Sequence, residues 1–475
     1  MKHRLILAIS AALVCISLQA KVSLPSFFSD NMVLQHSTDV AVWGTTDKGG
    51  VKVTVSPSWD KKKYTITASA NGKWSTRIPT PAPGGPYSIS FTDGDKTVID
   101  NVLIGEVWLC GGQSNMEMPM MGFTGQPVED ATRYILTAKP STPVRMCTIK
   151  KKASTKELDS TEGSWEENTP EAVLNTSATA WFFGQMLQEV LDVPVGLLVC
   201  CWGGSPVETW MRRDILESNF SGEFDLAFLD QDKLPKRKPH HYPCTSFNGM
   251  LSALIPFTFK GMIWYQGEAN RLRPEQYTRL QPTFVKMVRD FFENPEAPFY
   301  FVQIAPYKYE NADGYESGYF YEAQEKTLSL IPGSGMVSTV DVGELGTIHP
   351  RKKKEVGERL ALQALAKTYG VNMVEADSPS LESAAFEDGK AVVTMKVGPL
   401  GLAPIGTDLA GFELAGEDRV FHPATGIVQD KVKVIVCCPE VPVPVAVRYC
   451  FKNFSIGTLY NCSGLPARPF RSDNW

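Results

Sequence analysis

The sequence has few histidines and no long apolar run after its first residues. It contains six histidines among 475 residues, so few positions can supply an imidazole. After residue 20, no stretch is apolar for long enough to cross a bilayer, and we expect no membrane span. The net charge of −5 is spread over both signs without long blocks. These features exclude a membrane-spanning protein and give no electrostatic footprint for nucleic acid.

Cysteine spacing argues against a structural metal. No CxxC pair and no Cys/His cluster has the spacing of a zinc site, so we expect no metal. The adjacent pairs Cys200-Cys201 and Cys437-Cys438 end apolar runs, which predicts small core residues rather than a disulfide framework. An oxidising compartment still permits one or two disulfides among the other cysteines.

The first 20 residues have the features of a secretory signal. A basic start at residues 1–4 precedes the apolar residues 5–18 and the small Ala20. Cleavage after Ala20 would release a chain that begins at Lys21. We therefore expect a soluble bacterial protein that is periplasmic or secreted.

The length predicts two or three domains beyond residues 1–20. Residues 21–102 form short alternating segments separated by Gly- and Pro-rich turns, which is typical of an antiparallel β-sandwich. Residues 103–370 alternate apolar strands with helical stretches. Residues 371–475 return to β-type segments. We expect an N-terminal β domain, a catalytic α/β domain and a C-terminal β region within these bounds.

The middle region predicts a parallel sheet with helices on both faces. The expected strands are residues 103–109, 195–201, 260–265, 299–304 and 335–340, and the expected helices are residues 178–191, 274–292 and 351–367. In such a fold the active site lies at the carboxyl ends of the strands. The polar motifs of this region follow strands.

Ser114 lies in the most informative motif, Gly-Gln-Ser-Asn-Met at residues 112–116. The apolar run before it reads as a buried strand, and Gly111 and Gly112 allow a sharp turn. The turn would lift the Ser114 side chain to the edge of the sheet, where nucleophiles lie. A lone serine among turn residues can equally be an ordinary loop residue.

A serine hydroxyl needs a base to take its proton, and histidine is the usual one near neutral pH. His349 follows the strand at residues 336–340 and lies at the same edge as Ser114. It can also be a solvent-facing or structurally bonded histidine. The other histidines fit less well: His240 and His241 are expected in a surface loop, and His422 lies in the C-terminal β region.

Two further strand ends offer hydrogen-bond donors. Gly204 follows the second strand, where glycine allows a backbone N–H to approach a bound carbonyl. Gln266 follows the third strand and carries a side-chain amide that could stabilise an oxyanion. Taken alone, the first is also a plain tight turn and the second a polar helix cap.

Together these motifs resemble the SGNH-type esterases, and specifically the sialate O-acetylesterase family. The resemblance rests on four ordered blocks, at residues 112–116, 202–206, 263–270 and 348–350, and on both ends, at residues 28–35 and 464–473. It covers nearly the whole chain after residue 20. It implies an SGNH-hydrolase-like α/β fold flanked by β-sandwich-type regions at both ends.

The resemblance also implies the roles of the site residues. Ser114 would be the nucleophile and His349 the base, and the N–H groups of Ser114 and Gly204 with the amide of Gln266 would form the oxyanion hole. Supporting positions are Gln113, Asn115, Glu268 and Asn270. The implied substrate is O-acetylated sialic acid or a sialoglycan, and no metal or organic cofactor is needed.

The sequence departs from the family pattern next to the base. Members often have an acidic residue two positions before the histidine, and Thr347 stands there. A carboxylate normally orients the imidazole. Either a backbone carbonyl takes that part, or Asp341, Glu344 or Glu268 does.

Substrate and class stay open in three respects. A sialate carboxylate favours a nearby cation, and Arg212, Arg213, Arg271 and Arg273 all lie near the motifs. An acetylxylan-type deacetylase would use the same catalytic residues, and a non-catalytic carbohydrate-binding protein is the alternative outside enzymes.

If the protein is an esterase, its activity should fall when His349 becomes protonated. An ordinary histidine has a pKa of about 6 to 7, so we expect the fall in that pH range. The sequence does not indicate the oligomeric state.

Overall fold

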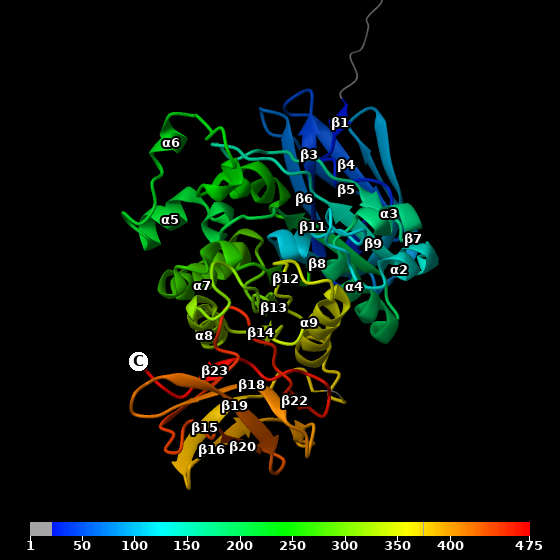
Figure 1. Ribbon diagram of the computed structural model, residues 1–475. Coiled ribbons are helices and arrows are strands. Elements are labelled where there is room, and N and C mark those ends of the chain that lie inside the picture. Colours follow the sequence, from blue (N-terminus) through cyan, green and yellow to red (C-terminus); the bar gives the residue numbers. More distant parts are fainter. Residues whose placement is uncertain (1–20, 374) are drawn as a thin grey trace, which may run out of the picture.

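The computed structural model describes residues 21–373 and 375–475. The predicted signal segment therefore lies outside the described residues. Figure 1 shows a β region of early residues at one end, an α/β region in the middle and a second β region at the other end. The all-β, α/β, all-β order is the one predicted from the sequence.

The central sheet is mixed, with the strand order β10-β9-β11-β8-β12-β13-β14. All neighbours in this series pair in parallel except β10, an antiparallel edge strand. The strands are β8 (Lys96–Gly112), β9 (Val144–Thr148), β10 (Trp165–Glu166), β11 (Val195–Cys201), β12 (Gly261–Tyr265), β13 (Phe299–Val302) and β14 (Ser334–Val337). The five predicted strands are present, and β9 and β10 were not predicted.

Side chains alternate between the two faces along each strand, so both faces of this sheet carry apolar side chains. Helices cover both of these faces. On β12, Met262 and Trp264 share a core with α7 and α8, whereas Ile263 and Tyr265 share a core with α4 and α9. The helices are α4 (Ala178–Leu191), α7 (Pro274–Phe291), α8 (Glu316–Leu330) and α9 (Lys353–Lys367). The prediction for α4 is confirmed at both ends, α7 and α9 differ by one and two residues, and α8 was missed.

Strand β8 joins the N-terminal region to the central sheet. Its first half pairs antiparallel with β7, and its second half pairs in parallel with β11 and β12. The remaining N-terminal strands are β1 (Val22–Ser23), β2 (Val33–Gln35), β3 (Asp39–Thr46), β4 (Lys52–Pro57), β5 (Tyr64–Thr67), β6 (Lys73–Pro79) and β7 (Gly84–Thr92). One continuous strand thus runs across the expected division between residues 102 and 103.

The C-terminal region is a seven-stranded antiparallel sheet with a core of its own, accompanied by a two-stranded sheet of β17 and β22. It packs against α8, where the rings of Tyr319 and Phe451 lie 5.4 Å apart at 89°. Its strands are β15 (Ser380–Glu387), β16 (Lys390–Lys396), β17 (Leu402–Ala403), β18 (Leu409–Ala415), β19 (Phe421–Val428), β20 (Lys433–Cys437), β21 (Ala446–Tyr449), β22 (Tyr460–Asn461) and β23 (Phe470–Arg471).

The other helices of the described chain are short. They are α1 (Ser114–Glu117), α2 (Ala131–Thr137), α3 (Pro170–Asn175), α5 (Arg213–Asn219), α6 (Ala227–Asp230), η1 (Val207–Trp210), η2 (Pro239–His241), η3 (Phe247–Leu251), η4 (Ser252–Leu254) and η5 (Glu268–Asn270). Across the described ranges, no helix combines the length and apolarity needed to cross a bilayer.

The nine cysteines in the described part of the chain are all free thiols. Cys200, Cys201 and Cys438 are buried, as predicted for core residues. Cys437 is exposed, because it ends β20 on the outward-facing side of the strand. The prediction of a core position is therefore wrong for Cys437.

Candidate active site

Ser114 begins α1 directly after β8 ends at Gly112. Gly112 has φ +141°, and a Cβ there would lie 2.2 Å from the Tyr265 carbonyl oxygen, so only glycine fits. The next residue, Gln113, donates its N–H to that same carbonyl at 2.9 Å. This close approach of β8 to β12 turns the chain at the carboxyl edge of the sheet and leaves Ser114 half-buried there.

His349 lies against Ser114, although the two residues are 235 positions apart in the sequence. Its Nε2 is 2.7 Å from the Ser114 hydroxyl oxygen. His349 is reached by the loop that follows β14, the last strand of the parallel series. The structure therefore brings the predicted nucleophile and the predicted base within hydrogen-bond distance.

The other ring nitrogen of His349 faces a residue that the sequence did not single out. Nδ1 lies 2.6 Å from Oε1 of Gln126, whose oxygen also accepts from the Thr347 hydroxyl at 3.0 Å. Gln126 is half-buried in the loop between α1 and α2. A lone glutamine in a loop has no motif to mark it, so no sequence signal could have found it.

None of the three carboxylates considered for this position contacts His349 in the described ranges. Asp341 forms a two-point ion pair with Arg359 at 2.8 and 2.6 Å. Glu344 accepts the backbone N–H of Arg351. Glu268 accepts from Asn115. The backbone-carbonyl alternative is also not seen, because Nδ1 faces the Gln126 side chain.

Burial lowers the pKa of His349 to about 4, and the positive charge of Lys353 adds to this effect. The ring of Phe123 packs edge-on against the imidazole at a centroid distance of 5.2 Å. An imidazole with this pKa is neutral and able to accept a proton throughout the neutral range. The sequence-based expectation of a pKa near 6 to 7 is therefore too high for this environment.

Asn115 belongs to a buried polar network behind Ser114. Its Nδ2 donates to Glu268 Oε1 at 2.6 Å and to the Ile348 carbonyl at 3.1 Å. Its Oδ1 accepts from Lys353 Nζ at 2.5 Å. Burial lowers the pKa of Lys353 to about 7 and raises the pKa of Glu268 above its usual value. The network ties α1 to η5, to α9 and to the residue before His349.

The turn after β11 lies beside Ser114. A Cβ at Gly203 would lie 3.2 Å from the Ser114 Cβ, and the Gly203 N–H donates to Glu117 Oε2 at 2.5 Å. Lys151 holds the other oxygen of Glu117 at 2.5 Å. Within the two described ranges, the N–H groups of Ser114 and Gly204 have no protein acceptor.

His240 and His241 flank this turn. His240 stacks on Trp202 at a centroid distance of 4.4 Å, and His241 Nε2 is 3.0 Å from where a Gly204 Cβ would be. His241 is exposed and His240 half-buried. Burial lowers the pKa of both imidazoles, to about 4 for His240. The loop reaches the surface as expected, but it also lines the candidate site, which the sequence did not indicate.

Gln266 does not present a free donor to a substrate. It is fully buried, and its amide nitrogen lies within hydrogen-bond distance of Gln113 Oε1, the Ser205 carbonyl and Asn270 Oδ1. The Asn270 amide nitrogen donates to Glu208 at 2.9 Å. The oxyanion role expected for Gln266 is therefore not supported, because its two N–H groups are used within the protein. Gln113, Gln266 and Asn270 instead fix the turn after β12 beneath Ser114.

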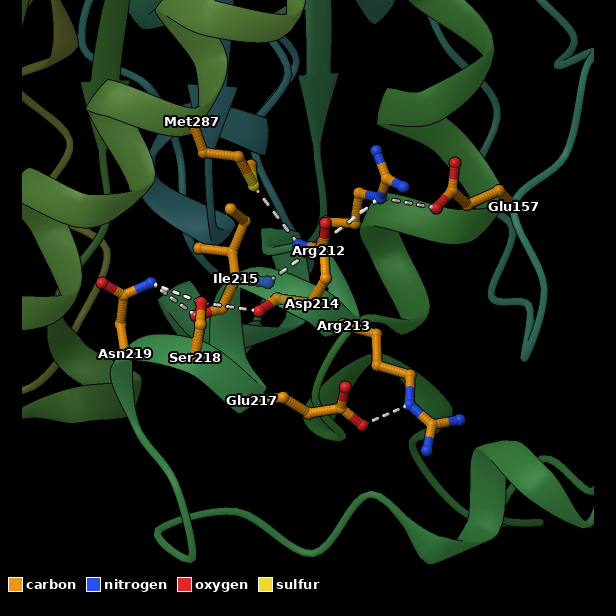
Figure 2. A network of polar contacts seen from close by, with 9 residues as sticks. All are labelled: Glu157, Arg212, Arg213, Asp214, Ile215, Glu217, Ser218, Asn219 and Met287. Atoms are coloured by element: carbon orange, nitrogen blue, oxygen red, sulfur yellow. Dashed lines mark hydrogen bonds and ion pairs between the residues drawn. The ribbon is translucent and has the colours of Figure 1, made fainter.

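The four arginines considered for a substrate carboxylate are all engaged in ion pairs. Arg212 contacts Glu157 and Asp214, and Arg213 contacts Glu217 on α5 (Figure 2). Arg271 pairs with Glu310 at 2.7 Å, and Arg273 pairs with Glu208 at 2.6 Å. The structure gives no reason to select one of the four.

Comparison with known proteins agrees with the sequence motifs. The family described as "carbohydrate esterase, sialic acid-specific acetylesterase" matches residues 104–366, more than half of the chain. Human sialate O-acetylesterase is 27% identical over 390 residues, which cover 74% of this chain and 72% of the human one. The mouse sialate O-acetylesterase is 28% identical over 403 residues, covering 73% of each chain.

A solved structure is similar over almost the whole length. The crystal structure of a carbohydrate acetylesterase from Xanthomonas citri has a TM-score of 0.84 and 32% sequence identity, and the match covers 96% of this chain and 100% of that one. The resemblance inferred from the motifs is thereby confirmed. The chain belongs to the sialic acid-specific acetylesterase family of carbohydrate esterases, which are carboxylic ester hydrolases.

Proposed function

We propose that the protein removes O-acetyl groups from sialic acids with Ser114 as nucleophile and His349 as base. The observation that carries this proposal is the 2.7 Å contact between the Ser114 hydroxyl oxygen and Nε2 of a neutral imidazole. Nε2 takes the hydroxyl proton while the oxygen attacks the acetyl carbonyl. The protonated ring then gives that proton to the departing sugar oxygen. Water, deprotonated by the same nitrogen, then attacks the acetyl-serine, acetate leaves, and the imidazole returns the proton to the Ser114 oxygen.

The N–H groups of Ser114 and Gly204 are the proposed oxyanion donors. Neither has an acceptor within the described protein, and Gly203 packs directly on Ser114. Donors already fixed in place stabilise a developing oxyanion without reorganisation. Glu117 holds the turn in this position through the Gly203 N–H. Neither a metal nor an organic cofactor enters these steps.

The choice of sialic acid rests on the family and on the named relatives. The mammalian relatives are called sialate O-acetylesterases, whereas the Xanthomonas citri relative is called only a carbohydrate acetylesterase. A deacetylase for acetylated xylan would use the same serine and histidine, so it is the second candidate. The paired arginines favour neither substrate.

The test is acetate release by the wild type and by Ser114→Ala. O-acetylated sialoglycan, acetylated xylan and a chromogenic acetate ester should be assayed in parallel. The proposal expects release from the sialoglycan and the chromogenic ester by the wild type, with none above background for the variant. Activity on xylan alone would favour the second candidate. Sugar binding without any acetate release would indicate a carbohydrate-binding protein.

We also propose export through the N-terminal segment, with a mature chain that begins at Lys21. N-terminal sequencing of protein purified from the periplasm and the medium tests this. Protein that keeps Met1 and stays in the cytoplasm would contradict it.

A further inference from the structure

Gln126 occupies the position beside His349 at which serine hydrolases often have a carboxylate. We propose that Gln126 is a positioning residue of this site: its amide oxygen binds the Nδ1–H of His349, so that the Nε2 lone pair faces Ser114. This inference rests on the proposed esterase function. In this protein a neutral amide would orient the imidazole, a role for which the family pattern normally has an acidic side chain.

Two small hairpins lie beside His349, one against its imidazole and one bonded to its backbone. Phe123 and Gln126 exchange both backbone hydrogen bonds at 2.9 Å, and Glu344 and Thr347 pair through an isolated antiparallel bridge. The first hairpin contacts His349 at both of its ends, with the Phe123 ring against the imidazole and the Gln126 amide at Nδ1. Gln126 therefore belongs to the hairpin that packs against the imidazole ring.

Thr347 favours the orientation in which the Gln126 amide oxygen faces the ring. The Thr347 hydroxyl oxygen accepts the backbone N–H of His349 at 3.1 Å, and its own O–H has two acceptors, Gln126 Oε1 at 3.0 Å and the His349 carbonyl oxygen at 3.4 Å, of which Gln126 is the nearer. With the amide oxygen receiving this bond, the same oxygen accepts Nδ1–H. Nε2 is then unprotonated, which is the tautomer that a base for Ser114 needs. The threonine that departs from the family pattern thus supports the glutamine.

The charged groups around His349 bond to other residues, although one buried oxygen of Glu268, Oε2, has no hydrogen-bond partner within the described residues. Lys353 on α9 bonds Asn115, and Glu268 on η5 accepts from the same asparagine. In the loop before α9, Glu344 accepts the Arg351 N–H, and the Arg351 guanidinium lies 3.7 Å from Glu129. Within the described ranges, no carboxylate therefore touches the ring. A ring held by an amide gains no anion to stabilise its protonated form, in agreement with the lowered pKa of His349.

The experiment compares the pH dependence of kcat/KM for the wild type, Gln126→Glu and Gln126→Leu. Glutamate keeps the acceptor and adds a negative charge next to the imidazole. It should raise the pH at which activity falls by about one to two units. Leucine removes the acceptor and should lower kcat by roughly tenfold to a hundredfold at neutral pH, with KM little changed. Gln429→Glu, an exposed residue after β19, adds the same charge far from the site and should leave the profile unchanged.

A second measurement does not depend on turnover. Nitrogen NMR of histidine-labelled protein reports the tautomer and the pKa of His349, one of only six histidines. Nδ1 should carry the proton at neutral pH, and Gln126→Glu should raise the imidazole pKa.

The outcomes separate this inference from the function beneath it. Unchanged pH profiles and unchanged His349 titration in both Gln126 variants of an active enzyme would overturn the role of Gln126. A wild type without esterase activity, but with the expected tautomer and titration shift, would instead overturn the proposed function and leave the positioning role standing.

Discussion

Ser114 and Asn115 are neighbours in the sequence, yet their side chains belong to two different networks. Ser114 lies at the half-buried edge of the sheet in a line of neutral groups, with His349 and Gln126. Asn115 is fully buried and bonds two ionisable groups, Glu268 and Lys353. The buried network that fixes the backbone holds two ionisable groups that each bond Asn115, whereas no carboxylate among the described residues hydrogen-bonds Ser114, His349 or Gln126. The difference predicts that damage to the first network abolishes chemistry, whereas damage to the second lowers stability.

The largest expected effect comes from removing the base. His349→Ala should lower kcat/KM by roughly 10⁴-fold, since the serine then has no proton acceptor. Its thermal unfolding should change little. His422→Ala is the matched control, because this half-buried histidine lies on β19 in the C-terminal region and pairs with Glu440 there. Kinetics with a chromogenic acetate ester measure the effect, and a loss of less than tenfold would separate His349 from the reaction.

Breaking the buried network should act mainly on stability. Lys353→Met leaves the Asn115 amide oxygen without its buried donor and removes the positive charge that acts on Glu268, and the free energy of unfolding should fall by about 3 kcal/mol. Lys354→Met removes the neighbouring, more exposed lysine and should cost about 0.5 kcal/mol or less. Denaturant unfolding compares the two variants. Equal stabilities for both would show that the Lys353–Asn115 hydrogen bond does not hold α1 and α9 together.

A smaller effect is expected at the turn beside Ser114. Gly204 has φ +77° and lies against His241, so Gly204→Ala should displace the Gly204 N–H and lower kcat by roughly tenfold to a hundredfold. Gly222→Ala is a matched control, because Gly222 has φ +76° and open space around it. It carries the same backbone strain without touching the site. If both variants lost activity equally, strain rather than the N–H position would be the cause.

Periodicity was sufficient to predict the strands that precede Ser114 and His349, but not the short helix α1 that begins at Ser114. The α4 helix is apolar over most of its length and begins at a capping serine, and β11 is an unbroken apolar run, so the bounds of these two elements could be read from the residues. The other predicted strands were placed correctly, but their ends differ from the prediction. The helix α8 was not predicted, because some of its buried residues, such as Gln324 and Thr327, are polar and weaken its apolar pattern. Strand β10 has only two residues, which is too short for any period.

A site residue could be predicted from the sequence only where its residue type by itself indicates its chemical role. Serine and histidine stand out because few side chains can perform their steps. Gln126 does not stand out, since its role comes from two hairpins that meet only in the folded chain. The amide of Gln266 was assigned a role from its type and place, but its actual bonds to Gln113 and Asn270 depend on packing between three turns. Residue type predicts capability, and tertiary contacts decide whether that capability is free.

The most direct test of a neutral imidazole activating Ser114 is the rate at which a fluorophosphonate reagent labels the protein as a function of pH. Burial lowers the pKa of His349 to about 4. The base works only when it is unprotonated, so the labelling rate should rise through about pH 4 and be level by about pH 6, with the label on Ser114 and none on Ser114→Ala. Labelling at another residue, or a rate that still climbs steeply above pH 7, would contradict the account.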